Sequence, residues 1–308
     1  MDFFIQLFTD PLGFYSSHQL LVGQIGVNSL LAISIFVTLY SGQLTLANVG
    51  FMAIGGYTSV IMSLHLPTPL VVDILAGTLL AGAVGFVVGL PVLRLRGVFL
   101  AIATIGFGEA LRFGVLLNLD ITGRGQGLTN TSADPTGGIL PVWISVVVLA
   151  YVFWRLTGTK LGQAWAAIRE DELAAASQGI NVPANKMVAF VIGALLAGYA
   201  GALDAHLNFF IDPTEYAFNR AVAVLIFAVV GGVTSVFGPI VGAIFLTALP
   251  EIIRQAKDYR DVVNGIVLIL IIIFRPQGIL GRGGLAIIRP RWWPEAWTLG
   301  GRRAAPQP

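Results

Sequence analysis

The stretches LLVGQIGVNSLLAISIFVTLY (Leu20–Tyr40) and LTLANVGFMAIGGYTSVIMSL (Leu44–Leu64) contain no charged residue. An α-helix rises about 1.5 Å per residue and the hydrocarbon core of a bilayer is about 30 Å thick, so about 20 apolar residues span it. Each stretch is long enough to do so. Together they predict membrane-spanning helices and set the class of fold.

Similar apolar runs recur along the chain, which is 56% hydrophobic and only 11% charged. Soluble domains carry about 25% charged residues, so lipid is the expected solvent for most of this chain. The further spans that we expect are Leu70–Leu93, Gly97–Asn118, Ile139–Leu156, Met187–Leu207 and Val262–Phe274. The predicted fold is an all-α, polytopic membrane helical bundle.

Residues 221–250 form an uncharged run that one helix does not explain. A single helix of that length would extend for about 45 Å, and two full spans barely fit. The pairs Gly231-Gly232 and Gly238-Pro239 lie near its middle, where they would break or reverse a helix. We predict two short or re-entrant crossings here, and about nine crossings in all, with eight and ten as alternatives.

The distribution of Lys and Arg predicts the orientation of the chain. The set expected inside is Arg94, Arg96, Arg155, Lys160, Arg169, Lys186 and six arginines beyond residue 274, and the set expected outside is Arg124, Arg220, Arg254, Lys257 and Arg260. We therefore expect residues 1–19 to be periplasmic or interfacial, 20–275 to form the transmembrane domain with a cytoplasmic loop at 158–186, and 276–308 to form a cytoplasmic tail. Since the first residues lack a basic segment, no cleavable signal peptide is expected.

Several function classes lack their sequence signatures. The chain has no cysteine, its three histidines stand far apart, and no basic stripe suggests a nucleic-acid partner. Motifs of nucleotide-binding loops, serine hydrolases and zinc proteases are absent from the sequence. We expect neither a metal site nor an enzyme.

Ionisable residues within apolar runs are functional candidates by default. The sequence offers Asp73, Glu109, Arg112 and Asp204. Glu109 and Arg112 are three residues apart and can pair on one helix face, whereas Asp73 and Asp204 lie near predicted helix ends. Local pairing or anchoring explains these residues as well as a functional role does, and a proton-coupled transporter would need a deeper acidic relay.

Small residues repeat every four positions in two expected spans. The repeats are Gly77, Ala81, Gly85 and Gly89, and Gly193, Ala197, Gly201 and Ala205. In lipid, helices associate where small residues let their backbones approach closely. These faces predict tight helix packing, with lining of a substrate path as the alternative.

The polar loop KLGQAWAAIREDELAAASQGINVPANK (Lys160–Lys186) lies between two spans. Its apolar residues Trp165, Ile168, Leu173 and Ala176 recur at three to five positions, as in an amphipathic helix. Gly179 and Pro183 would end that helix. A surface helix with no binding role would show the same pattern.

The run ELAAASQG (Glu172–Gly179) resembles the loop by which permeases of ABC importers dock their ATPase. Six segments, one of which contains this run, fall in the order and spacing of the high-affinity branched-chain amino-acid permeases of the M type, over residues 40–282: GQLTLANVGFMAIGGY from Gly42, PVLRLRGVFLAIATIGFGEALR from Pro91, TGRGQGLTN from Thr122, AIREDELAAASQGIN from Ala167, FGPIVGA from Phe237 and FRPQGILG from Phe274. The chain thus resembles this family.

The resemblance implies an inner-membrane importer that lies in lipid and has four kinds of subunit. These are this permease, a homologous second permease, two cytoplasmic ATPases that bind ATP, and a periplasmic substrate-binding protein; no cofactor is expected on this chain. The implied ATPase-coupling residues are Arg169, Glu170, Asp171, Glu172, Ala175 and Gly179. The candidate translocation path comprises Gly42, Gln43, Thr45, Asn48, Thr104, Glu109, Gly231 and Gly232.

The sequence departs from the family pattern near the expected path. Ala47-Asn48 replaces the usual Gly-His pair, and Thr45 replaces a Ser. Leu, Ile and Val are the expected cargo, and a path poor in fixed charge suits a zwitterion. Urea, short amides and aromatic amino acids are alternative cargoes, and a secondary transporter or channel is the alternative class.

Overall fold

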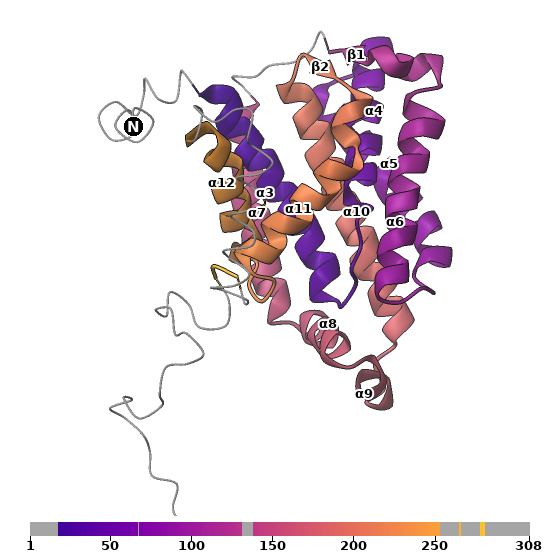
Figure 1. Ribbon diagram of the computed structural model, residues 1–308, viewed down its shortest axis with the longest axis vertical. Coiled ribbons are helices and arrows are strands. Elements are labelled where there is room, and N and C mark those ends of the chain that lie inside the picture. Colours follow the sequence, from indigo (N-terminus) through magenta and orange to yellow (C-terminus); the bar gives the residue numbers. More distant parts are fainter. Residues whose placement is uncertain (1–17, 67, 131–137, 253–264, 266–277, 281–308) are drawn as a thin grey trace, which may run out of the picture.

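The computed structural model describes residues 18–66, 68–130, 138–252, 265 and 278–280. Figure 1 shows a helical bundle with α8 and α9 at one end, here named the α8–α9 end, and the short strands β1 and β2 at the other, the β1–β2 end. The helices are α3 (Gln19–Tyr40), α4 (Asn48–His65), α5 (Leu70–Val92), α6 (Val98–Leu111), α7 (Ile139–Thr157), α8 (Lys160–Glu170), α9 (Glu172–Ser177), α10 (Val182–Leu207), α11 (Phe218–Gly231) and α12 (Phe237–Ile252).

Short elements complete the β1–β2 end. The π-helical turn η1 (Arg112–Leu116) continues α6, and the 3-10 turns are η2 (Asp120–Thr122), η3 (Arg124–Gln126) and η4 (Pro213–Tyr216). Strands β1 (Leu128–Thr129) and β2 (Phe210–Ile211) pair antiparallel. They tie the segment after α6 to the segment between α10 and α11.

Five helices in the described part of the chain are long and apolar enough to cross a membrane. They are α3, α5, α6 with η1, α7 and α10. The prediction of an all-α helical membrane protein is confirmed. The predicted span Val262–Phe274 lies outside the described residues except for Gly265, so the number nine stays a prediction.

Residues 221–250 form the predicted pair of short helices. Helices α11 and α12 have 14 and 16 residues, which correspond to about 21 and 24 Å against a hydrocarbon core of about 30 Å. They pack against each other as a hairpin, and Gly232 begins the turn at a φ of 105°, a conformation that favours glycine. The backbones at Gly231 and Gly238 approach too closely for a side chain on either.

Two predicted span boundaries are wrong. The span expected from Leu44 begins as a helix only at Asn48, because α3 ends at Tyr40 and a largely buried non-helical segment, Ser41–Ala47, follows. The span expected over Gly97–Asn118 is α-helical only to Leu111 and then widens into η1. In both places, Ser41–Ala47 and η1, the backbone that is not α-helical lies next to polar side chains.

The core is a close packing of α4, α5 and α10 through small residues. A methyl group on Gly55 would overlap the carbonyl oxygen of Gly198, and one on Gly201 would overlap that of Met52. Both predicted small-residue faces are buried, so their packing role is confirmed. In lipid, such backbone contact is the main source of helix association.

We expect Gly55→Ala to lower stability by about 1 to 3 kcal/mol, because the added methyl group must push two backbones apart. Gly106→Ala is the matched control, since Gly106 also lies inside a helix and an added Cβ meets no atom within 4 Å. Thermal unfolding of both purified variants measures the difference. Equal melting temperatures would contradict the packing account.

Candidate functional site

The loop between α7 and α10 folds as two capped helices instead of the single predicted one. The Thr159 side chain caps α8, and the Asp171 carboxylate accepts from the N–H groups of Leu173 and Ala174 at 2.8 and 3.1 Å. Because Asp171 is extended, at φ −157° and ψ 114°, it ends α8 and starts α9 in a new direction. Asp171 is thus a helix cap.

The predicted end of this loop at Gly179 is confirmed. Gly179 has a φ of 82°, and its N–H donates to the Ala176 carbonyl at 3.0 Å. The next N–H, of Ile180, reaches back to the Ala175 carbonyl at 3.2 Å, which completes a Schellman motif. Asn181 then caps α10 by accepting from the N–H of Ala184.

The break at Asp171 changes which side chains face outward. Trp165 and Ile168 are buried as predicted, whereas Leu173 is 76% exposed and Ala176 is exposed, contrary to the predicted apolar face. Ala175 is buried instead. Of the coupling residues Glu172, Ala175 and Gly179, Ala175 is therefore turned into the protein and Gly179 is exposed.

Two charged residues of this loop are turned toward the bundle. The Glu172 carboxylate pairs with Nζ of Lys186, which is itself buried at the start of α10, and lies 4.0 Å from Nε of Arg96. Arg169 packs on the ends of α3 and α11, whereas Glu170 is exposed. The exposed residues among the predicted coupling set are Glu170, Asp171 and Gly179.

Four of the predicted path residues meet around the non-helical segment Ser41–Ala47. Gln43 Nε2 donates to Ser41 Oγ at 2.7 Å and to the Lys186 carbonyl at 3.0 Å. The N–H of Leu46 donates to Thr104 Oγ1 at 3.0 Å. These contacts connect the segment to α10 and α6.

Asn48 and Thr45 complete this polar cluster. Asn48 Nδ2 donates to Ser34 Oγ at 2.7 Å, and Thr45 Oγ1 accepts from the N–H of Ala47 at 3.2 Å. The side-chain oxygens of Gln43 and Asn48 are buried without a hydrogen-bond partner. Buried polar groups normally have a partner, so these two oxygens are places where a water molecule or another polar molecule can bind.

The other predicted path residues lie elsewhere. Gly231 and Gly232 belong to the turn of the α11–α12 hairpin, at the α8–α9 end. Gly42 is exposed there and contacts the backbone of Arg169. The two breaks in helical structure, Ser41–Ala47 and Gly232–Val236, thus both meet α8.

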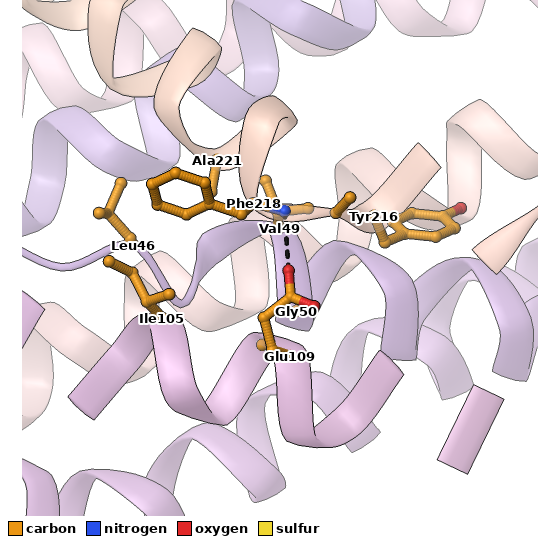
Figure 2. A pocket seen from close by; sticks show the side chains of 10 residues that line it. Leu46, Val49, Gly50, Ile105, Glu109, Tyr216, Phe218 and Ala221 are labelled. Carbon is orange, nitrogen blue, oxygen red and sulfur yellow. Dashed lines mark hydrogen bonds between the residues drawn. The ribbon is translucent and has the colours of Figure 1, made fainter. Parts of the chain in front are cut away.

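Glu109 lies apart, in a narrow cleft where α4, α6 and α11 meet (Figure 2). Its Oε1 accepts from the N–H of Phe218 at 2.9 Å, at the start of α11, and its Oε2 pairs with Arg112 at 2.8 Å, which confirms the predicted pair. The cleft has a volume of about 10 Å³, enough for about one water molecule. Tyr216 lines it, and burial raises the pKa of that phenol well above its ordinary value.

Sequence reasoning missed a second buried network, near the β1–β2 end. Asp204 of α10 pairs with Arg220 of α11 at 3.7 Å, and Arg220 donates to Asn28 of α3 at 3.4 Å. Asn28 in turn donates to Thr247 of α12 at 3.1 Å. The available signal was the presence of Asn28 and Thr247 inside long apolar runs, where a polar side chain needs a partner.

These features define a class: a helical membrane protein with interrupted helices and a capped loop at one end. A family model described as "Branched-chain amino acid transport system / permease component" matches residues 19–272. The chain belongs to this family of transport permeases.

The relatives agree with that membership. The chain is 34% identical over 272 residues to the high-affinity branched-chain amino acid transport system permease protein LivM of Escherichia coli K12, a match covering 78% of this chain and 64% of LivM. It is 34% identical over 160 residues to LivH of the same strain, which covers 50% of each chain. It is also 25% identical over 220 residues to the autoinducer 2 import system permease LsrC of Shigella flexneri, covering 68% of this chain and 63% of LsrC.

The chain thus spans less than two thirds of the length of the LivM proteins that it matches. No solved structure matches it.

Glu172→Ala should destabilise the α8–α9 loop by about 1 to 3 kcal/mol, because it leaves the ammonium group of Lys186 buried without its partner. Glu170→Ala is the control, since the Glu170 side chain is 69% exposed. Limited proteolysis within residues 160–186 measures local opening. Equal cleavage rates in the two variants would contradict the anchoring role of Glu172.

Proposed function

We propose that this chain is a membrane permease subunit of an ATP-driven importer for branched-chain amino acids such as Leu, Ile and Val. A homologous second permease, two cytoplasmic ATPases that bind ATP and a periplasmic substrate-binding protein would complete the importer. Family membership supports the transport role. The observation that carries the coupling to an ATPase is the position of α8, which contacts both breaks in the helices.

The proposed docking surface consists of the exposed residues of α9 and its flanks. Leu173 is a large apolar side chain that is 76% exposed on a short polar helix, and Glu170 and Gly179 flank it. An exposed apolar residue with a charged rim is the usual composition of a binding site for another protein. Trp165 and Ile168 hold α8 against the bundle, so force applied to α9 reaches the helices.

The proposed translocation path runs past the polar cluster of Gln43, Thr45, Asn48 and Thr104. Polar groups on interrupted helices are the typical substrate contacts of transporters, because unwound backbone offers free donors and acceptors. The cluster is buried in this conformation, so passage requires a second conformation in which it is exposed. Glu109 lies outside this cluster, near the C-terminal end of α6. We propose that it holds the start of α11 in place.

The proposed orientation places the α8–α9 end in the cytoplasm of a bacterial inner membrane. Among the described residues, Arg94, Arg96, Arg155, Lys160, Arg169 and Lys186 lie at or next to this end, and Arg112, Arg124 and Arg220 lie toward the other. Basic residues gather on the cytoplasmic side of membrane proteins. The termini, which would be periplasmic and cytoplasmic respectively, lie outside the described residues.

The decisive experiment is uptake into vesicles that contain the chain with its partner subunits and binding protein. ATP-dependent uptake of leucine supports the proposal. Uptake of urea, a short amide or an aromatic amino acid instead would assign another cargo. Uptake of equal rate without ATP would favour a secondary transporter or channel.

Leu173→Glu should lower co-purification of the ATPase by about tenfold or more, because it places a charge in an interface that the leucine would bury. The control is Gln126→Glu, which adds the same charge at an exposed position near the β1–β2 end. Quantitative pull-down from detergent extracts gives the ratio. An unchanged yield for Leu173→Glu would exclude α9 from the docking surface.

A cysteine at Ser177 should react with a membrane-impermeant maleimide only after the cytoplasmic side is opened, whereas one at Gln126 should react in intact spheroplasts. Both positions are exposed and the natural chain has no cysteine, so each variant reports a single site. Gel-shift labelling with and without permeabilisation measures this. Labelling of the Ser177 variant in intact spheroplasts would reverse the proposed orientation.

A further inference from the structure

Arg169, near the end of α8, contacts both breaks in the helices. Its guanidinium lies 5.0 Å from the ring centroid of Tyr40, the last residue of α3, and its Nη1 donates to the Val233 carbonyl at 3.3 Å in the hairpin turn. Its backbone lies directly against Gly42, where a Cβ would stand 3.0 Å from Arg169 Cα. One residue thus connects α8 to segments more than a hundred residues apart.

The side chain is directed away from the proposed docking surface. Only 20% of the Arg169 side chain is exposed, against 69% for its neighbour Glu170. The resemblance alone would place both residues in the charged run that faces the ATPase. The two side chains differ in exposure, with Glu170 outward and Arg169 inward, and they pair with each other through Arg169 Nη2 and Glu170 Oε1 at 3.6 Å.

The chemistry of the contact is specific to arginine. The planar guanidinium can stack on the Tyr40 ring and donate in its own plane to a carbonyl oxygen at the same time. Lysine carries the same charge on a compact ammonium group, which cannot make both contacts in this geometry.

We propose that Arg169 is a positioning residue that transmits the displacement of α8 to the segments Ser41–Ala47 and Gly232–Val236. This inference rests on the proposed coupling of the chain to an ATPase. Trp165 and Ile168 pack α8 on the bundle, and Arg169 follows Ile168 in the same helix. A displacement of α8 therefore carries the guanidinium of Arg169 with it. The Val233 carbonyl and the Tyr40 ring then move together, and the two breaks change conformation in step.

The test compares Arg169→Met, Arg169→Lys and the control Lys160→Met in the complete reconstituted importer. Lys160 is an exposed cation at the other end of α8. For Arg169→Met we expect normal ATPase co-purification and persistent ATP hydrolysis, with the amount of leucine taken up per ATP reduced about tenfold, the factor that corresponds to one charge-assisted hydrogen bond. Arg169→Lys should give an intermediate amount of leucine taken up per ATP, and Lys160→Met should give the same amount as the natural chain.

Spin labels supply a readout that does not depend on transport. Cysteines at Gln163 in α8 and Thr234 in the hairpin turn report the distance between them. A single narrow distance in the chain with the natural Arg169 and a broadened distance distribution in Arg169→Lys support the proposal. This comparison still tests the proposal if Arg169→Met does not fold.

Three results separate the possible failures. Normal uptake per ATP in Arg169→Met, or an unchanged distance distribution in Arg169→Lys, overturns the positioning role. Loss of the ATPase from an otherwise folded Arg169→Met complex also overturns it, because Arg169 would then be a docking residue. If the unsubstituted chain fails to bind an ATPase at all, the proposed function is wrong and not merely the role of Arg169.

Discussion

A chain surrounded by lipid has to satisfy its backbone N–H and C=O groups from within the protein. This constraint determines where helices can be interrupted. After α3 the N–H groups of Gly42 and Gln43 turn back to the Leu39 and Thr38 carbonyls, and that of Leu46 finds Thr104 Oγ1. Helices α6, α8 and α10 cover the interruption, and α6 and α10 supply partners for its polar groups. The break and the positions of these helices therefore depend on each other.

The hairpin turn obeys the same constraint in another way. The carbonyls of Val230 and Gly231 at the end of α11 lack partners within their own helix. They accept from the N–H groups of Ile279 and Leu280 at 2.8 and 3.0 Å. A segment far along the chain thus completes this break, as α6 completes the first. Ile279 and Leu280 belong to the motif FRPQGILG, for which the sequence alone indicated no structural role. These two hydrogen bonds give it one.

Hydropathy predicted the five long apolar helices of the described residues, and glycine pairs predicted the hairpin, because both depend on local composition. The direction of side chains in residues 160–186 could not be predicted in this way. A helical period assumed across Asp171 puts Leu173 inward, but one extended residue there rotates α9 and puts Ala175 inward instead. Nor could spacing show that Glu172 pairs with Lys186, since that contact depends on how the turn at Gly179 places α9 against the start of α10.

The α11–α12 hairpin is held differently at its two ends. Near the β1–β2 end the network of Asp204, Arg220, Asn28 and Thr247 joins it to α10 and α3 through side chains on four helices. At the α8–α9 end backbone contacts and Arg169 hold its turn. If α8 shifts as proposed, it acts on the turn of the hairpin while the side-chain network holds the other end, so a small displacement becomes a tilt of α11.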